Sequence, residues 1–233
     1  MRTEGQDARV LADPVDAIIY RLSHDLRASS RAIAEVPDWI AEDLEEAGID
    51  LPSKTAESLT LLQKNARRLD SMISGLLIHS RVARQEARLL DAGQCVIKTL
   101  GAYSSRENAR FRWRCEPGLV RMAKNDLDLA IRILVSNAVT HNPGVARIAV
   151  ITRAVSPWWE FTIRDDGFGI PEKDRVRAME PLTRLRACDD TPSAGMGLAI
   201  LEKIVRAYDG QLDVSGRRVG SGTTVRLRLP LAA

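Results

Sequence analysis

Apolar residues recur in alternating steps of four and three over the first forty residues, a spacing that predicts one long helix with a single apolar stripe. The stripe consists of Val15, Ile19, Leu22, Leu26, Ser29, Ile33, Val36 and Ile40. The same rhythm at Leu59, Leu62, Ala66, Leu69, Ile73 and Leu76 predicts a second helix. Between them, Gly48-Ile49-Asp50-Leu51-Pro52-Ser53 supplies a terminating glycine, a proline and a helix-starting serine. We therefore expect an antiparallel helical hairpin.

Two helices with one apolar stripe each cannot close a core alone. Pairing two hairpins into a four-helix bundle covers both stripes, so we expect a homodimer through the hairpin. The alternative, which the pattern leaves open, is that the stripe packs on the second half of the same chain.

The second half mixes helical and strand patterns, with a division near Asp91-Ala92-Gly93. Helices are expected at 95–105, from a cap at Asn125 or Asp126 onward, and at 197–208; strands are expected at 111–115, 119–122, 146–152, 158–164, 212–215 and 223–229. We therefore expect an α+β fold, with a hairpin domain at 1–90 that forms a dimeric four-helix bundle. An α/β sandwich at 94–233, with a mixed sheet and helices on one face, should follow it.

Composition narrows the function classes. Basic and acidic residues, 34 and 31 of the 233 residues, are interspersed and give a net charge of +3, so we expect no nucleic-acid partner. No apolar run approaches the ~18 residues that span a bilayer, and the N-terminus lacks the apolar core of a secretory signal. We expect a cytoplasmic protein without membrane insertion. Cys95, Cys115 and Cys188 have no metal-binding spacing.

Two glycine-rich segments in the second half are candidate ligand sites. Asp165-Asp166-Gly167-Phe168-Gly169 follows a predicted strand, where glycines let a ligand approach the backbone and a carboxylate can accept a hydrogen bond from the amino group of adenine. Gly195-Met196-Gly197-Leu198 opens a predicted helix, whose free N–H groups can bind phosphate. Taken alone, each segment also fits an ordinary turn or loop.

Two further segments are also candidates. Asn137 lies on a predicted helix, and its amide oxygen is a suitable ligand for Mg²⁺ bound to phosphates, although a structural hydrogen bond would also explain it. Gly220-Ser221-Gly222-Thr223-Thr224 offers hydroxyl groups near a strand start, where a hairpin turn is almost as good an explanation.

The order and spacing of these four segments resemble the ATP-binding domain shared by sensor histidine kinases, Hsp90-type chaperones and MutL-type repair ATPases, over roughly residues 92–230. The resemblance implies that Asp165 binds adenine, that Thr223 supports the adenine site, and that Asn137 holds Mg²⁺. The other nucleotide-binding residues that it implies are His141, Gly167, Gly169, Gly195, Gly197 and Leu198.

The first helix contains Ser23-His24-Asp25-Leu26-Arg27. His24 lies about 200° around the helix from Leu22, so we expect it to point into solvent, with the neighbouring Asp25 able to fix the tautomer of the imidazole. A lone exposed histidine is usually an ordinary surface residue. This segment, however, resembles the H-[DE]-L-R phosphoacceptor motif of histidine kinases, and Leu76-Leu77-Ile78-His79-Ser80-Arg81 resembles the end of that family's second helix.

Together, the two halves resemble a cytoplasmic bacterial histidine kinase core, most like the kinases attached to phytochrome-type photoreceptors. The resemblance implies ATP and Mg²⁺ as cofactors, autophosphorylation of His24 assisted by Asp25, and transfer to the receiver domain of a response regulator in trans. A separate sensor protein is a possible further partner. Ile133 departs from the family pattern, which often has a second Asn there. The alternative is a phosphotransfer adaptor whose degenerate ATP domain binds no nucleotide.

Overall fold

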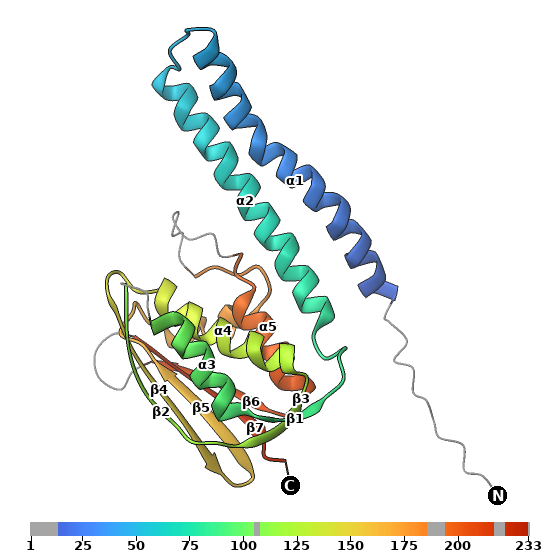
Figure 1. Ribbon diagram of the computed structural model, residues 1–233, viewed down its shortest axis with the longest axis vertical. Helices are drawn as coiled ribbons and strands as arrows, with labels where there is room; N and C mark the ends of the chain where they lie inside the picture. The colour runs from blue at the N-terminus through green and yellow to red at the C-terminus, as the bar shows by residue number, and fades with distance from the viewer. Residues whose placement is uncertain (1–13, 105–107, 186–193, 217–221, 233) are drawn as a thin grey trace, which may run out of the picture. The chain divides into compact units, whose positions relative to one another are not determined.

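The computed structural model describes residues 14–104, 108–185, 194–216 and 222–232 (Figure 1). The chain divides into two compact units, Met1–Ser80 and Arg81–Ala233. No helix in the described ranges is both long and apolar enough to cross a bilayer.

The first unit is the predicted helical hairpin. Helix α1 (Pro14–Glu46) and helix α2 (Ser53–Arg81) run antiparallel to one another (Figure 1). The turn between them contains Gly48 at a φ of +69°, a conformation that glycine adopts without steric cost. The Ile49 N–H donates to the Leu44 carbonyl at 2.9 Å and closes the end of α1. The hairpin expected from the apolar spacing is therefore confirmed.

Small side chains line the contact between α1 and α2. Ser30 is buried and donates its hydroxyl to the Ala66 carbonyl at 2.9 Å, and Arg27 donates to the Ser74 hydroxyl at 2.9 Å. Several large apolar residues of α1 are exposed: Leu26 is 47% exposed and Trp39 is 53% exposed. Further exposed apolar residues of the two helices are Ile33, Val36, Ile40, Leu61, Leu62, Leu69 and Ile78. A single hairpin thus leaves many of its large apolar side chains uncovered.

The second unit is built on a five-stranded mixed sheet in the order β2-β4-β5-β7-β6. The strands are β2 (Ala109–Cys115), β4 (Ala146–Val155), β5 (Trp158–Arg164), β6 (Gln211–Gly216) and β7 (Thr223–Pro230). Strands β2 and β4 are parallel, and the other neighbours are antiparallel. Strand β1 (Arg88–Asp91) pairs separately with β3 (Leu119–Met122).

Three helices cover one face of this sheet: α3 (Ala92–Ser104), α4 (Lys124–Thr140) and α5 (Gly197–Ala207) (Figure 1). The core between the two layers is mostly aliphatic, and burying each large side chain there contributes about 1.5–3 kcal/mol. Its fully buried members include Leu127, Ile131, Leu134, Phe161, Ile163, Leu201 and Leu227. The expected mixed sheet with helices on one face is confirmed.

The division between the two halves, expected near Asp91-Ala92-Gly93, lies elsewhere in the structure. The Ala92 N–H donates to the Gly118 carbonyl at 2.9 Å, and a Cβ on Gly93 would lie 2.5 Å from the Glu116 carbonyl oxygen. These residues are therefore packed inside the second unit, and the division between the units falls at Ser80–Arg81.

The start of α4 is a second correction, because neither Asn125 nor Asp126 is its N-cap. The N-cap is Ala123, which makes no side-chain capping hydrogen bond. Its N–H donates instead to the hydroxyl of Tyr208, at 3.2 Å, and that hydroxyl donates to Asp126 Oδ2 at 2.7 Å. The same oxygen accepts from the Ala83 N–H at 2.9 Å. Asp126 and Tyr208 thus join α4, the end of α5 and the segment that follows α2.

Replacing Tyr208 with Phe tests this connection. Burial, together with the hydrogen bond to Asp126, raises the pKa of Tyr208 to about 12, whereas tyrosine in an unfolded chain ionises near 10. The wild-type protein should therefore lose stability between pH 10 and 12, where only the unfolded chain ionises this group. We expect Tyr208→Phe to lower the free energy of unfolding by about 1 kcal/mol at pH 8 and to make its decline above pH 10 shallower. Urea unfolding of both chains at pH 8 and 11 measures both effects, and identical curves would contradict the assignment.

Candidate functional site

The carboxylate of Asp165 lies buried where β5 ends, and it connects two segments that are far apart in the sequence. Its Oδ1 accepts hydrogen bonds from the Gly167 N–H at 2.9 Å and the Thr223 N–H at 3.1 Å. The Asp165 N–H donates to the Thr223 carbonyl at 3.0 Å. Oδ2 accepts no hydrogen bond from the described residues. One oxygen of this carboxylate is therefore fixed by the backbone, and the other is available to a ligand that carries an amino group.

The two neighbouring acids are held differently. Burial raises the pKa of Asp165, although the N–H bonds from Gly167 and Thr223 oppose this effect. Burial also opposes ionisation of Asp166, but hydrogen bonds from the Arg147 N–H at 2.8 Å and from Asn142 Nδ2 at 2.9 Å outweigh it and lower the pKa of Asp166. Asp166 thereby anchors the loop after α4, a positioning role that sequence reasoning missed.

His141, the C-cap residue of α4, lies against the same glycine-rich loop. The His141 carbonyl accepts from the Phe168 N–H at 3.3 Å, and a Cβ on Gly167 would lie 2.4 Å from that carbonyl oxygen. Only glycine fits at such a distance. The structure thus brings together His141, Asp165, Gly167 and Thr223.

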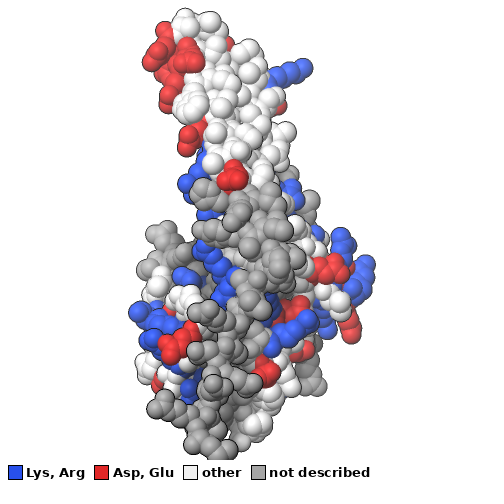
Figure 2. Space-filling model, turned by 90° about the vertical axis from the view of Figure 1, so that its right-hand side faces the viewer, with Lys and Arg blue, Asp and Glu red and all other residues white. Residues whose placement is uncertain are grey.

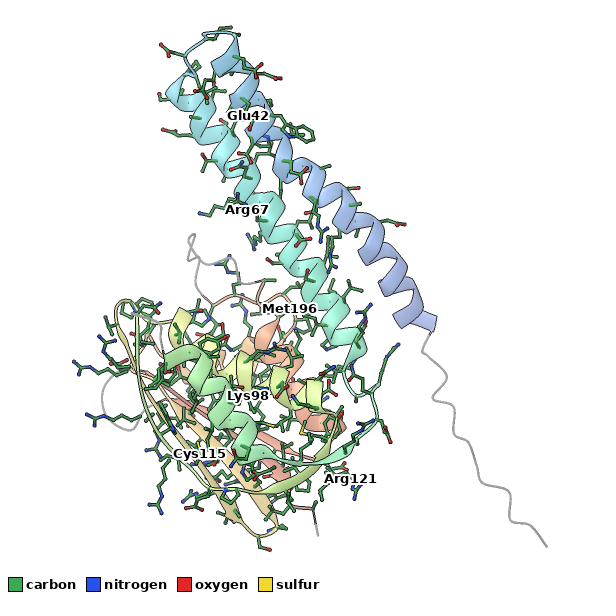
Figure 3. All side chains as sticks on the ribbon, viewed as in Figure 1. Glu42, Arg67, Lys98, Cys115, Arg121 and Met196 are labelled. Carbon is green, nitrogen blue, oxygen red and sulfur yellow. The ribbon has the colours of Figure 1, made fainter. Side chains whose placement is uncertain are left out.

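Asn137 lies one turn before His141, on the same side of α4, and faces the start of α5. A Cβ on Gly197 would lie 3.5 Å from Asn137 Oδ1 and 3.4 Å from Ile133 Cγ2. Figure 3 labels Met196, which immediately precedes α5 and gives that helix no side-chain cap. Leu198 lies in the first turn of the helix. The backbone N–H groups of this turn are suited to bind an anion such as phosphate.

Asn137 also fits a role as a Mg²⁺ ligand. Its amide oxygen is a hard ligand of the kind that Mg²⁺ prefers, and phosphate oxygens commonly complete such a site. Among the described residues, no three His, Cys, Asp or Glu side chains gather in a way that would hold a metal ion. In such a site, Asn137 would hold the cation together with phosphate oxygens of the ligand.

Gly195 fixes the segment that leads into α5. It has a φ of +69°, and a Cβ there would lie 2.4 Å from the Thr183 carbonyl oxygen. Gly169 also has a positive φ, +75°, and lies against Gly222. A Cβ on Gly169 would lie 3.1 Å from the Gly222 carbonyl oxygen. Gly220 and Ser221 of the predicted segment lie outside the described residues.

The remaining candidates belong to the first unit. His24 and Asp25 lie in α1, and Asp25 is exposed. The side chain of His24 lies outside the described part of the chain.

Residues 122–233 match the family described as histidine kinase-, DNA gyrase B-, and HSP90-like ATPase. The chain is similar to the adaptive-response sensory kinase SasA of Synechococcus sp. (strain JA-2-3B'a(2-13)), with 26% identity over 99% of this chain and 63% of the relative. It is 24% identical to cyanobacterial phytochrome A of Nostoc sp. (strain PCC 7120 / SAG 25.82 / UTEX 2576), over 91% of this chain and 28% of that protein. It thus spans less than two thirds of the length of either relative.

A solved structure with the same fold is full-length ShkA in complex with AMPPNP. The TM-score is 0.65 at 20% identity, and the likeness covers 94% of this chain and 46% of that one.

Gly195→Ala tests whether the backbone before α5 forms part of a nucleotide site. The substitution places a Cβ at a positive φ and against the Thr183 carbonyl, so we expect a loss of about 1–3 kcal/mol of stability. ATP affinity, measured by titration calorimetry, should fall as well. The matched control is Gly101→Ala on α3, where a Cβ would meet no atom within 4 Å; it should leave ATP affinity unchanged. Equal ATP affinity in both variants would remove Gly195 from the site.

Proposed function

We propose that this chain, which has a sensor histidine kinase core, is an ATP-dependent protein histidine kinase that phosphorylates its own His24. The hairpin is its dimerisation and phosphoacceptor domain, and the second unit is its catalytic domain. The phosphoryl group then passes to an aspartate in the receiver domain of a separate response regulator.

The observation that carries this proposal is the buried carboxylate of Asp165. Its Oδ1 is held by two backbone N–H groups, and its Oδ2 accepts from no described residue. The exocyclic amino group of adenine is a donor that suits this oxygen. Thr223 supports the adenine site through its backbone, because it both donates to and accepts from Asp165.

In this proposal, the phosphates of ATP bind at the start of α5. Asn137 lies beside Gly197 there, and the free N–H groups of the first helical turn stabilise negative charge. Mg²⁺, when bound by Asn137 and phosphate oxygens, neutralises charge on the triphosphate. Since Asn137 and His141 lie on one helix, α4 sets the spacing between the phosphate and adenine ends of the site.

The nucleophile in this proposal is a ring nitrogen of His24. It attacks the γ-phosphorus, the bond from that phosphorus to the bridging oxygen breaks, and ADP leaves. Phosphoryl transfer has a loose transition state, so catalysis consists mainly of positioning and charge stabilisation. Asp25, the next residue, orients the imidazole and takes the proton that His24 loses.

Dimerisation through the hairpin is supported by the uncovered apolar stripe. Ile33, Val36 and Ile40 recur at the heptad spacing of a helix-bundle core and are exposed. Two copies of the hairpin would bury these residues in a four-helix bundle. The input signal would come from a sensor, either a separate protein or another part of the same protein.

One observation favours the adaptor as a second candidate function. Ile133 presents a methyl group 3.4 Å from the Cβ position of Gly197, so an apolar side chain lies next to the proposed phosphate site. An adaptor would carry phosphate on His24 without binding ATP. Titration of the purified protein with ATP and Mg²⁺ separates the two functions, because only the kinase binds nucleotide.

Incubation with γ-labelled ATP and Mg²⁺ tests the proposed kinase. We expect wild-type protein to incorporate label that is stable to base and labile to acid. His24→Gln should incorporate none because the nucleophile is absent, and Asp165→Asn should lose at least about 100-fold in rate because adenine recognition is weakened. The matched control is His79→Gln on α2, which should retain labelling. Label that persists in His24→Gln would exclude His24 as the phosphoacceptor.

Ile33→Asp tests the dimer. Placing a carboxylate in the bundle core removes apolar burial worth about 1.5–3 kcal/mol per protomer and leaves a charge without a partner. We expect the dissociation constant to rise by at least about 100-fold, which sedimentation velocity over a concentration series measures. Glu35→Ala, at the exposed neighbouring position 35, should leave it unchanged. A wild-type monomer would contradict the proposal, and so would an equally stable Ile33→Asp dimer.

A further inference from the structure

The sheet has a second face, on the side away from α3, α4 and α5, and arginine dominates part of it. In β2, Arg110, Arg112 and Arg114 alternate with Phe111, Trp113 and Cys115. These three alternating residues pair with Ile148, Val150 and Thr152 of β4, which are buried. Because side chains alternate along a strand, the three arginines point to the opposite face. Figure 3 shows nitrogen-tipped side chains that project from the sheet on that side.

The neighbouring strands extend this surface. Arg110 pairs with Arg147 of β4, and Arg112 pairs with Ala149, which in turn pairs with Arg164 of β5. Neighbouring strands lie about 4.8 Å apart, so these side chains form a compact group. We call this group the arginine face; it consists of Arg110, Arg112, Arg114, Arg147 and Arg164, all exposed.

At the other end of the same sheet face, arginines of β4 and β7 bind a carboxylate. Glu160 is buried there, and its Oε1 accepts from Arg153 at 2.8 Å while its Oε2 accepts from Arg228 at 3.1 Å. Arg226 lies 3.5 Å from the same Oε2. Burial opposes ionisation of Glu160, but these guanidinium groups outweigh it and lower the pKa of Glu160. The arginines at this end thus share one buried carboxylate within the chain.

Within the arginine face, Arg110 has an interaction of its own within the chain. Arg114 has one ion pair, with Glu116 at 3.5 Å, and Arg147 lies near Asp166, whose pKa it helps to lower. The side chains of Arg112 and Arg164 make no hydrogen bond or ion pair with any residue in the described ranges. The outward positions between them are Ala149, Ile151, Thr162 and Thr224, none of which carries a charge. This end of the sheet therefore presents positive charge without a carboxylate among its outward strand positions.

We propose that the arginine face is a docking surface for a protein partner that presents a carboxylate-rich segment. Guanidinium groups bind carboxylates in bidentate geometry, and the exposed Ile151 offers an apolar contact between the arginines. Phosphate groups have similar geometry, but proteins that bind single-stranded nucleic acid stack bases on aromatic side chains. The outward positions among these arginines carry none. The face therefore suits acidic side chains better than nucleotides.

The experiment uses the whole chain and fluorescently labelled poly-L-glutamate at about 50 mM salt, where surface charges are weakly screened. We expect binding that weakens as salt rises, and a loss of at least about tenfold in affinity for the Arg112→Glu/Arg164→Glu variant. Arg121→Glu/Arg132→Glu makes the same charge change at two exposed positions elsewhere in the second unit and should stay within about twofold of wild type. Thermal unfolding of all three chains shows whether they remain folded.

Three results would overturn the proposal. Wild-type protein that does not bind poly-L-glutamate has no such surface, and an equal loss in both double variants would show a general effect of net charge. Tighter binding of oligothymidylate than of poly-L-glutamate, lost with Arg112 and Arg164, would assign the face to nucleic acid.

A second copy of this chain could also bind the arginine face, because the loop end of the hairpin is acidic (Figure 2). Residues 38–50 there contain acidic residues and no Lys or Arg: Asp38, Glu42, Asp43, Glu45, Glu46 and Asp50. Suppose that wild-type protein assembles beyond a dimer at low salt. If Glu42→Gln/Glu45→Gln and Arg112→Glu/Arg164→Glu both prevent this assembly, the face binds another copy of the chain, and the proposal of a separate partner is wrong. Assembly that neither variant changes, or no assembly at all, supports a separate partner.

Discussion

A single buried carboxylate organises the site. Asp165 bonds to the backbone of its own loop through Gly167 and to the start of β7 through Thr223. The loop, the end of β5 and the start of β7 are therefore fixed together, and one carboxylate oxygen remains for a ligand. Helix α4 completes the arrangement, because it carries Asn137 toward α5 and the His141 carbonyl toward Gly167. In the proposed kinase, recognition of the base and of the phosphates would thus depend on elements that are fixed to one another.

The two units differ in how completely they bury their apolar residues. The second unit encloses its own core between a sheet and three helices, and can be understood as a folded domain. The hairpin instead joins its helices through small residues such as Ser30 and Ala66 and leaves Ile33 and Trp39 exposed. Its stability and its function should therefore depend on association. A dimeric hairpin that carries the phosphoacceptor would make assembly a requirement for activity.

Periodicity predicted the helices and strands well, because apolar spacing reports which face of an element is buried. It failed where contacts join distant residues. The Ala123 N–H at the start of α4 donates to Tyr208, and Gly93, where a division between domains was expected, is packed against Glu116. Local sequence can show neither contact. The arginine face was missed because the charges alternate with apolar residues along each strand. Only the pairing of β2, β4 and β5 brings those charges together. The pair Asp165-Asp166 was a visible signal, but the separate anchoring role of Asp166 depends on Asn142 and Arg147.

The most direct test of the central claim, that Asp165 selects the base, compares ATP with GTP by titration calorimetry at one Mg²⁺ concentration. Adenine presents an amino group to the open oxygen of Asp165, whereas guanine presents a carbonyl at the same position, and two acceptors repel each other. The account predicts that ATP binds at least about tenfold more tightly than GTP. Equal affinities for the two nucleotides would contradict it.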